Sequence, residues 1–107
     1  MRITASAVSV TVADVSASRS FLESTLGFRA VMEAPGFASL AHDDAGMNVI
    51  FLEEGLGTFK PESHRGTAGQ GLLLVFVVED IDREWERLRD AVTIVTPLEP
   101  EPWGERY

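Results

Sequence analysis

The two histidines, His42 and His64, have the widest chemical range of any side chains in this sequence. They are the only imidazoles in the chain, and each stands near a carboxylate, Asp43 or Glu62. Imidazoles and carboxylates together hold zinc and related ions, so these four residues are one candidate metal centre. The alternative is two exposed loop histidines, because His42 ends an apolar segment and His64 lies in a glycine-rich stretch. The chain has no cysteine, which excludes thiolate nucleophiles, cysteine-based metal sites and disulfides.

The remaining polar side chains indicate binding rather than covalent catalysis. Glu53 and Glu54 follow an apolar segment, where a carboxylate either binds a cation, acts as a general base or is merely solvated. Ser9 and Thr11 have no histidine nearby in sequence to activate a hydroxyl as a nucleophile. The glycine-rich stretch is not followed by Lys-Ser or Lys-Thr, which disfavours a phosphate-binding loop. We therefore predict no catalytic residue.

Composition and charge narrow the classes of partner. The formal net charge is −8, and no basic cluster offsets it, so we predict no binding to nucleic acid, whose phosphates require Lys and Arg. No apolar run approaches the roughly 20 residues that span a bilayer, and no signal peptide precedes the first strand. We expect a cytoplasmic protein without a membrane partner. Hydrophobic content of 45% is ordinary for a folded domain.

A repeat within the chain indicates how these side chains are positioned. The segment Val8–Val15 returns as Leu74–Ile81 with a constant offset, and the same offset pairs Leu22 with Leu88. Each copy has the pattern of a strand, an aspartate turn and an amphipathic helix. Two similar halves that share a buried face form a cleft, and small-molecule sites favour clefts. We therefore expect the functional site between the two halves.

The first half has the pattern βαβββ. Alternating residues predict a strand over 4–12, and Asp14 or Ser16 can cap a helix that ends before Gly27. Its expected inward stripe consists of Val15, Ser18, Phe21, Leu22 and Leu26. Three further strands are predicted at Phe28–Glu33, Phe37–His42 and Met47–Glu53, because turn residues separate these apolar segments.

The second half starts in the same way and is shorter. We predict a single domain over 1–107, with a first module at 1–54, a linker at 55–70 and an incomplete second module at 71–107. Strands are expected at Leu72–Val78 and Val92–Thr96, on either side of a helix with Ile81, Trp85 and Leu88 facing inward. The counterpart of Met47–Glu53 is missing. Either the chain was cut, or its tail exists beyond the given residues, or a partner subunit supplies the strand, and some compensation for the open sheet edge is expected.

Several motifs together resemble the vicinal oxygen chelate superfamily of glyoxalases, extradiol dioxygenases and bleomycin-resistance proteins. The resemblance lies in Val12–Phe21 and Leu26–Phe28 in the first half, and in Val78–Asp82, Pro97–Leu98 and Pro102–Arg106 in the second. It implies an α+β fold in which two βαβββ modules form a cupped mixed sheet around a site. It also implies pairing of modules, and we expect a homodimer.

The metal positions of that superfamily transfer to apolar residues in this chain. By the resemblance, they fall on Ala7, near Phe51 and on Leu73, and the fourth falls beyond the last residue. Methyl, phenyl and isobutyl side chains offer no lone pair to a cation. The resemblance therefore implies no metal and no cofactor, as in bleomycin-resistance-type members that sequester a drug.

Strand alternation assigns a ligand-binding surface to this predicted groove. The expected lining residues are Ala7, Ser9, Thr11, Val49, Phe51, Glu53, Leu73, Val75 and Trp103. Such a surface favours an apolar or aromatic small molecule, such as an antibiotic, with Glu53 and Glu54 meeting any positive charge. One alternative is a metal-dependent lyase or dioxygenase with a relocated metal at His42 and His64. Another is a scaffold or sensor that regulates a partner.

Overall fold

The first half of the chain forms the predicted order βαβββ. The computed structural model describes residues 1–56, 72–104 and 106. Its first five elements are β1 (Ala7–Val12), α1 (Val15–Leu26), β2 (Arg29–Ala34), β3 (Phe37–Ala41) and β4 (Asn48–Glu53). The helix and the last three strands agree with the predicted ranges to within about one residue at each end, and the first strand begins three residues later than predicted.

Both ends of α1 follow the capping signals in the sequence. The Asp14 side chain accepts a hydrogen bond of 3.0 Å from the backbone N–H of Ala17, which satisfies a first-turn donor. Gly27 adopts φ +74° at the other end, and its N–H donates to the carbonyl of Leu22. This left-handed conformation strains any residue with a Cβ, so glycine ends the helix here.

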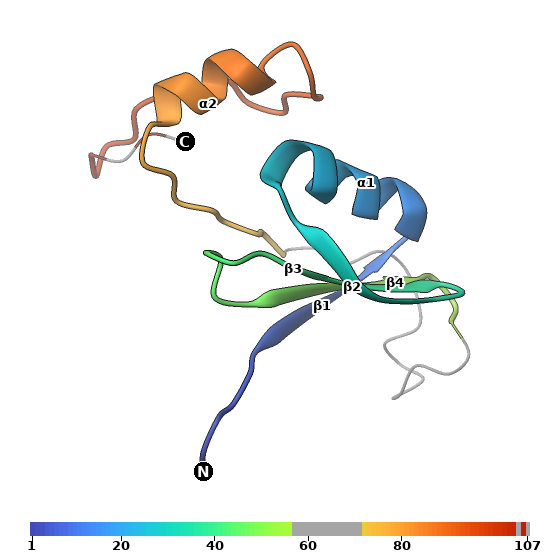
Figure 1. Ribbon diagram of the computed structural model, residues 1–107. Coiled ribbons are helices and arrows are strands. Elements are labelled where there is room, and N and C mark those ends of the chain that lie inside the picture. The colour runs from blue at the N-terminus through green and yellow to red at the C-terminus, as the bar shows by residue number, and fades with distance from the viewer. Residues whose placement is uncertain (57–71, 105, 107) are drawn as a thin grey trace. The chain divides into compact units, whose positions relative to one another are not determined.

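The four strands form one mixed sheet in the order β1-β4-β3-β2. β1 runs parallel to β4, and β3 is antiparallel to both of its neighbours. Helix α1 lies across one face of this sheet (Figure 1). The buried apolar side chains of the described residues are Leu22, Phe28, Ala38, Leu40, Val49, Phe51 and Leu52. Phe21, predicted to face inward, is instead 50% exposed, because it lies at the border of the helical stripe.

The chain divides into two compact units, 1–74 and 75–107. The second unit contains α2 (Ile81–Leu88), where the Asp80 side chain caps the N–H of Arg83 at 3.0 Å. The predicted stripe of Ile81, Trp85 and Leu88 is half-buried. Arg106 returns to the first turn of this helix, and both of its terminal nitrogens lie 2.9 Å from the carboxylate of Asp82. No helix in the described ranges is both long and apolar enough to cross a bilayer.

Two predicted strands of the second half do not form. Residues Leu72–Val78 and Val92–Thr96 have no strand conformation, and Val77 is 95% exposed. An apolar run becomes a strand only when a neighbouring strand satisfies its backbone groups, and no described strand pairs with either segment.

An isolated bridge joins Pro100 to Arg106. The predicted linker, 55–70, lies outside the described residues apart from Gly55 and Leu56. The fold class is α+β with a mixed sheet, as predicted.

Candidate functional site

Strand register assigns each residue of the sheet to one of two faces. Side chains directly opposite across neighbouring strands share a face, and successive residues alternate. Ala38 and Phe51, which are opposite each other, belong to the core beneath α1. The opposite set forms what we call the outer face, which consists of Ala7, Ser9, Thr11, Arg29, Met32, Ala34, Phe37, Ser39, Ala41, Asn48, Ile50 and Leu52.

The structure divides the predicted lining residues of the first module between these two faces. Ala7, Ser9 and Thr11 lie on the outer face, as predicted from alternation. The remaining three predicted residues of β4 lie on the α1 side, where they oppose Val8, Val10 and Val12: Val49, Phe51 and Glu53. The expectation that all six line one groove is therefore wrong. The parallel pairing sets odd-numbered residues of β1 opposite even-numbered residues of β4, and alternation within each strand does not reveal that parity.

The other predicted lining residues lie outside the sheet. Leu73 is 83% exposed and Val75 is 72% exposed, and both stand in a segment without strand conformation. Trp103 belongs to the second unit and is 63% exposed. It follows Pro102 and precedes Gly104, whose φ of +100° and N–H bond to the carbonyl of Glu101 form a tight turn. A ligand-binding role for these three residues stays a prediction.

The centre of the outer face is a row of alternating polar and apolar side chains. The row runs across the four strands as Ser9, Ile50, Ser39 and Met32. Met32 is 63% exposed, whereas Ser39 is 8% exposed and is the buried polar residue among those described. The prediction from sequence omitted Ile50, Ser39 and Met32. The signal in the sequence that could have indicated Ser39 is its position between apolar residues in β3, Phe37–Ala41.

The donor set of the outer face does not fit a divalent metal ion. Ala7, the first position implied by the resemblance, is opposite Asn48, and the next outer residues of β4 are Ile50 and Leu52. Within the four strands, this face carries hydroxyl and amide groups but no imidazole and no carboxylate. One amide oxygen beside weakly donating hydroxyls is less than the three or more strong ligands that such sites supply.

The described part of the chain does not complete the alternative metal centre at the histidines. His64 and Glu62 lie outside the described residues. The His42 ring packs against Phe28 with ring centroids 5.1 Å apart, and its Nδ1 accepts the N–H of Asp44 at 3.1 Å. No group of three or more metal-binding side chains is present among residues 1–56, 72–104 and 106.

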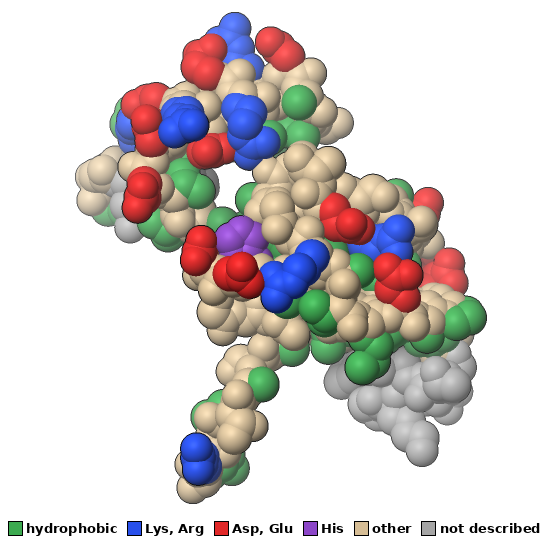
Figure 2. Space-filling view, viewed as in Figure 1, with side chains coloured by type: hydrophobic (Ala, Val, Ile, Leu, Met, Phe, Trp, Pro, Cys, Tyr) green, Lys and Arg blue, Asp and Glu red, His purple; other side chains and the backbone are tan. Residues whose placement is uncertain are grey.

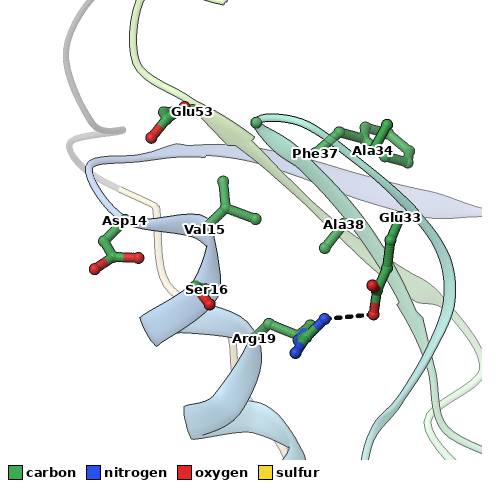
Figure 3. A pocket seen from close by; sticks show the side chains of 10 residues that line it. Asp14, Val15, Ser16, Arg19, Glu33, Ala34, Phe37, Ala38 and Glu53 are labelled. Atoms are coloured by element: carbon green, nitrogen blue, oxygen red, sulfur yellow. Dashed lines mark hydrogen bonds and ion pairs between the residues drawn. The ribbon is translucent and has the colours of Figure 1, made fainter.

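A hollow of about 240 Å³ opens between the start of α1 and the β2–β3 hairpin, at the edge of the sheet where its two faces meet. Figure 3 shows the start of α1 on one side of it and the β2–β3 hairpin on the other, joined by the ion pair between Arg19 and Glu33. Further residues of its lining are Asp14, Val15, Ser16, Ala34, Gly36, Phe37, Ala38 and Glu53. Three carboxylates and one arginine give this hollow a net negative charge, whereas the outer face carries one charged side chain, Arg29, which pairs with Asp43.

Charges of both signs are interleaved elsewhere on the surface. Over α2, acidic and basic side chains alternate (Figure 2), and Arg87 pairs with Glu84 at 2.8 Å while Arg89 lies 3.4 Å from Glu86. Exposed pairs of this kind contribute little to stability. In the described residues they leave no basic surface of the type that binds nucleic acid.

The family profile described as "Glyoxalase/Bleomycin resistance protein/Dioxygenase superfamily" matches residues 4–107. A protein of this description from Nocardioides shares 24% identity at a TM-score of 0.76, over 99% of this chain and 74% of the other. A superfamily member from Sphaerobacter thermophilus DSM 20745 shares 26% identity at a TM-score of 0.70, over 98% and 85%. Lactoylglutathione lyase from Agrobacterium tumefaciens shares the fold at 15% identity, with a TM-score of 0.72 over 99% and 83%. No curated protein matches the chain.

Proposed function

The chain belongs to the glyoxalase/bleomycin resistance protein/dioxygenase superfamily, and we propose that it is a metal-free member that binds a small molecule. The ligand is apolar or aromatic, such as an antibiotic, and lies on the outer face of the sheet. The protein sequesters this ligand without turnover. Binding is therefore expected to follow apolar contact and shape rather than coordination chemistry.

One observation carries the proposal. Where the resemblance implies a metal ligand on β1, this chain has Ala7, and the outer face of the four strands lacks imidazole and carboxylate groups. Lewis-acid chemistry requires such ligands to hold the ion. Without them, the same surface retains exposed Met32 and half-buried Ile50 and Phe37 as contact area for an apolar ligand.

Calorimetric titration against a panel of aromatic antibiotics tests the proposal. Met32→Gln and Ile50→Thr replace apolar contacts in the central row, so each is expected to weaken binding about tenfold, which corresponds to burying one side chain less well. Met47→Gln is the matched control, because Met47 lies in the turn before β4 and outside that row. Absence of binding at millimolar concentration across the panel contradicts the proposal.

Metal analysis tests the other half of the proposal. Protein purified without chelator is expected to contain far less than one equivalent of zinc, nickel, manganese or iron. A stoichiometric metal that is lost on His42→Ala would instead favour the lyase or dioxygenase alternative. Ala7→Ser serves as the control, since it changes the outer face without touching the histidines.

We further propose that the protein acts in the cytoplasm as a homodimer. The exposed apolar residues of Leu72–Val78 support association, because an apolar segment of this size gains free energy when a partner covers it. The net charge of −8 favours neither nucleic acid nor an anionic membrane surface as partner.

A further inference from the structure

Ser39 stands out among the side chains of the sheet because it is both polar and buried. It is 8% exposed, and no hydrogen bond from its hydroxyl to a described residue is found. Its oxygen is nevertheless not among the polar atoms closed off from the surface. Buried polar groups in folded proteins are nearly always hydrogen-bonded. A group from outside the chain is therefore the expected partner of this hydroxyl.

The surroundings of Ser39 are apolar and electrically neutral. Ile50 and Met32 flank it within the central row of the outer face. Arg29 is the single charged side chain that strand register assigns to this face, and Asp43 pairs with it at 2.7 Å. A charged ligand would lose hydration here without gaining an opposite charge. An uncharged ligand does not have this penalty.

Ser9 gives the row a second hydroxyl. It is exposed, and Ile50 separates it from Ser39. Neighbouring strands are about 4.8 Å apart, so the two serines lie about 10 Å from each other across the sheet. An aromatic body placed over Ile50 would bring a polar substituent at its edge within reach of either hydroxyl.

We propose that Ser39 is the hydrogen-bonding anchor of the outer-face site, and that the site selects an uncharged aromatic ligand bearing a hydroxyl or carbonyl group. This inference rests on the proposed function, since it takes the outer face as the ligand site. It differs from the expectation of a cationic ligand, because Glu53, one of the two carboxylates invoked for it, lies on the α1 side.

Four naphthalene probes with one common ring system test the selection by charge. Naphthalene, 2-naphthol, 2-naphthoate and 2-naphthylmethylammonium are titrated into the full chain at pH 7. We expect 2-naphthol to bind most tightly, and each ion to bind at least tenfold more weakly than 2-naphthol. Ions that bind as tightly as 2-naphthol overturn the selection for an uncharged ligand.

Variants of Ser39 test the anchor. Ser39→Ala is expected to weaken 2-naphthol binding about fivefold to tenfold, the range of one neutral hydrogen bond, while naphthalene binding is unchanged. Ser9→Ala gives a smaller loss, and Ser20→Ala on the exposed surface of α1 gives none. Ser39→Cys keeps the side-chain shape with a weak donor, so it provides the same comparison if Ser39→Ala does not fold.

The ratio of 2-naphthol to naphthalene affinity separates the possible failures. An unchanged ratio in the Ser39 variants overturns the anchor. If naphthalene still binds and Ile50→Thr weakens it, the outer face remains the ligand site and only the anchor fails. If no probe binds to the unaltered chain at millimolar concentration, both the anchor and the proposed function fail.

Discussion

Gly36, in the turn between β2 and β3, shows how a single residue shapes the edge of the hollow. Its φ is +71°, and a methyl group built on it would lie 3.1 Å from Leu56 Cδ1 and 3.2 Å from Glu53 Oε2. Its carbonyl also accepts the N–H of Glu53 at 2.9 Å. The residue thus joins the hairpin turn to the end of β4. A side chain at this position would have a strained backbone conformation and close contacts with Glu53 and Leu56.

Gly36→Ala is expected to lower the free energy of unfolding by about 2 kcal/mol, because a left-handed conformation and close contacts both oppose the methyl group. Gly46→Ala is the matched control, since Gly46 has φ +74° but no atom within 4 Å of an added Cβ. It should cost about 1 kcal/mol. Urea denaturation measures both, and equal losses would show that the contacts with Glu53 and Leu56 do not matter.

The pair of Asp82 and Arg106 predicts a local pH dependence. The hydrogen bond from Arg106 lowers the pKa of Asp82 below its ordinary value, and the same contact raises the pKa of Arg106. A depressed folded pKa contributes stability above the ordinary value of about 4, and this contribution disappears as the pH falls through the depressed value. It is small, because both side chains are exposed.

Carbon-detected NMR titration of the Asp82 carboxyl group measures this effect directly. We expect its midpoint below the ordinary aspartate range in the unaltered chain, and within that range in Arg106→Gln. Arg89→Gln is the control, since Arg89 contacts Glu86 and Asp90 instead. An unchanged Asp82 midpoint in Arg106→Gln would mean that the ion pair does not persist in solution.

At the scale of elements, the helix caps were the most reliable signals in the sequence. Asp14 and Asp80 are related by the repeat, and each accepts the N–H three residues later at 3.0 Å. A cap is a local interaction within one turn, so it needs no knowledge of distant residues. The turn residues between β2, β3 and β4 likewise fixed the strand boundaries.

Asp14→Ala is expected to lower the free energy of unfolding by about 1 kcal/mol, because it leaves a first-turn N–H of α1 without its acceptor. Asp14→Ser should retain most of the stability, since a hydroxyl caps nearly as well. Asp44→Ala removes an exposed carboxylate outside any cap and should change little. Thermal unfolding followed by circular dichroism compares the three; a full loss in the serine variant would argue against capping.

The faces of the sheet were harder to predict, for a physical reason. In β1, alternation of Val8 and Val10 with smaller residues indicates the buried side, and the structure agrees. In β4, residues Val49–Leu52 are all apolar, so the pattern does not distinguish the two faces. The register with β1 decides it. Ser39 was missed because its neighbours on the outer face, Ile50 and Met32, belong to other strands and are known only from the register.

The prediction of two strands in the second half was wrong, because a strand forms only when it pairs with a neighbouring strand. Leu72–Val78 is apolar throughout and has the composition of a strand covered on both faces. A strand exists only with a hydrogen-bonded neighbour, and such pairing is a long-range property. Helix α2 formed as predicted, since its hydrogen bonds are internal. Local elements were therefore predictable, whereas strand pairing in the second half was not.

At the scale of the whole molecule, five of the exposed apolar side chains among the described residues fall within one segment, Leu72–Val78. Leu73, Val75 and Val77 are 83%, 72% and 95% exposed, within a run that contains no polar residue from Leu72 to Val78. Scattered apolar residues are normal at a protein surface, but contiguous ones mark interaction sites. A second copy of the chain is the partner that the proposed homodimer supplies.

Sedimentation equilibrium at micromolar concentration is expected to give the mass of a dimer, about twice the 11.7 kDa of one chain. Val77→Lys should shift the equilibrium toward monomer by tenfold or more, because a buried interface does not tolerate an unpaired charge. Val95→Lys is the matched control: Val95 is 94% exposed but lies outside the apolar run, so its charge should leave the mass unchanged. A monomeric mass for the unaltered chain contradicts the dimer. Equal dissociation by both lysines would instead mean that added charge acts generally, and that Leu72–Val78 is not the contact surface.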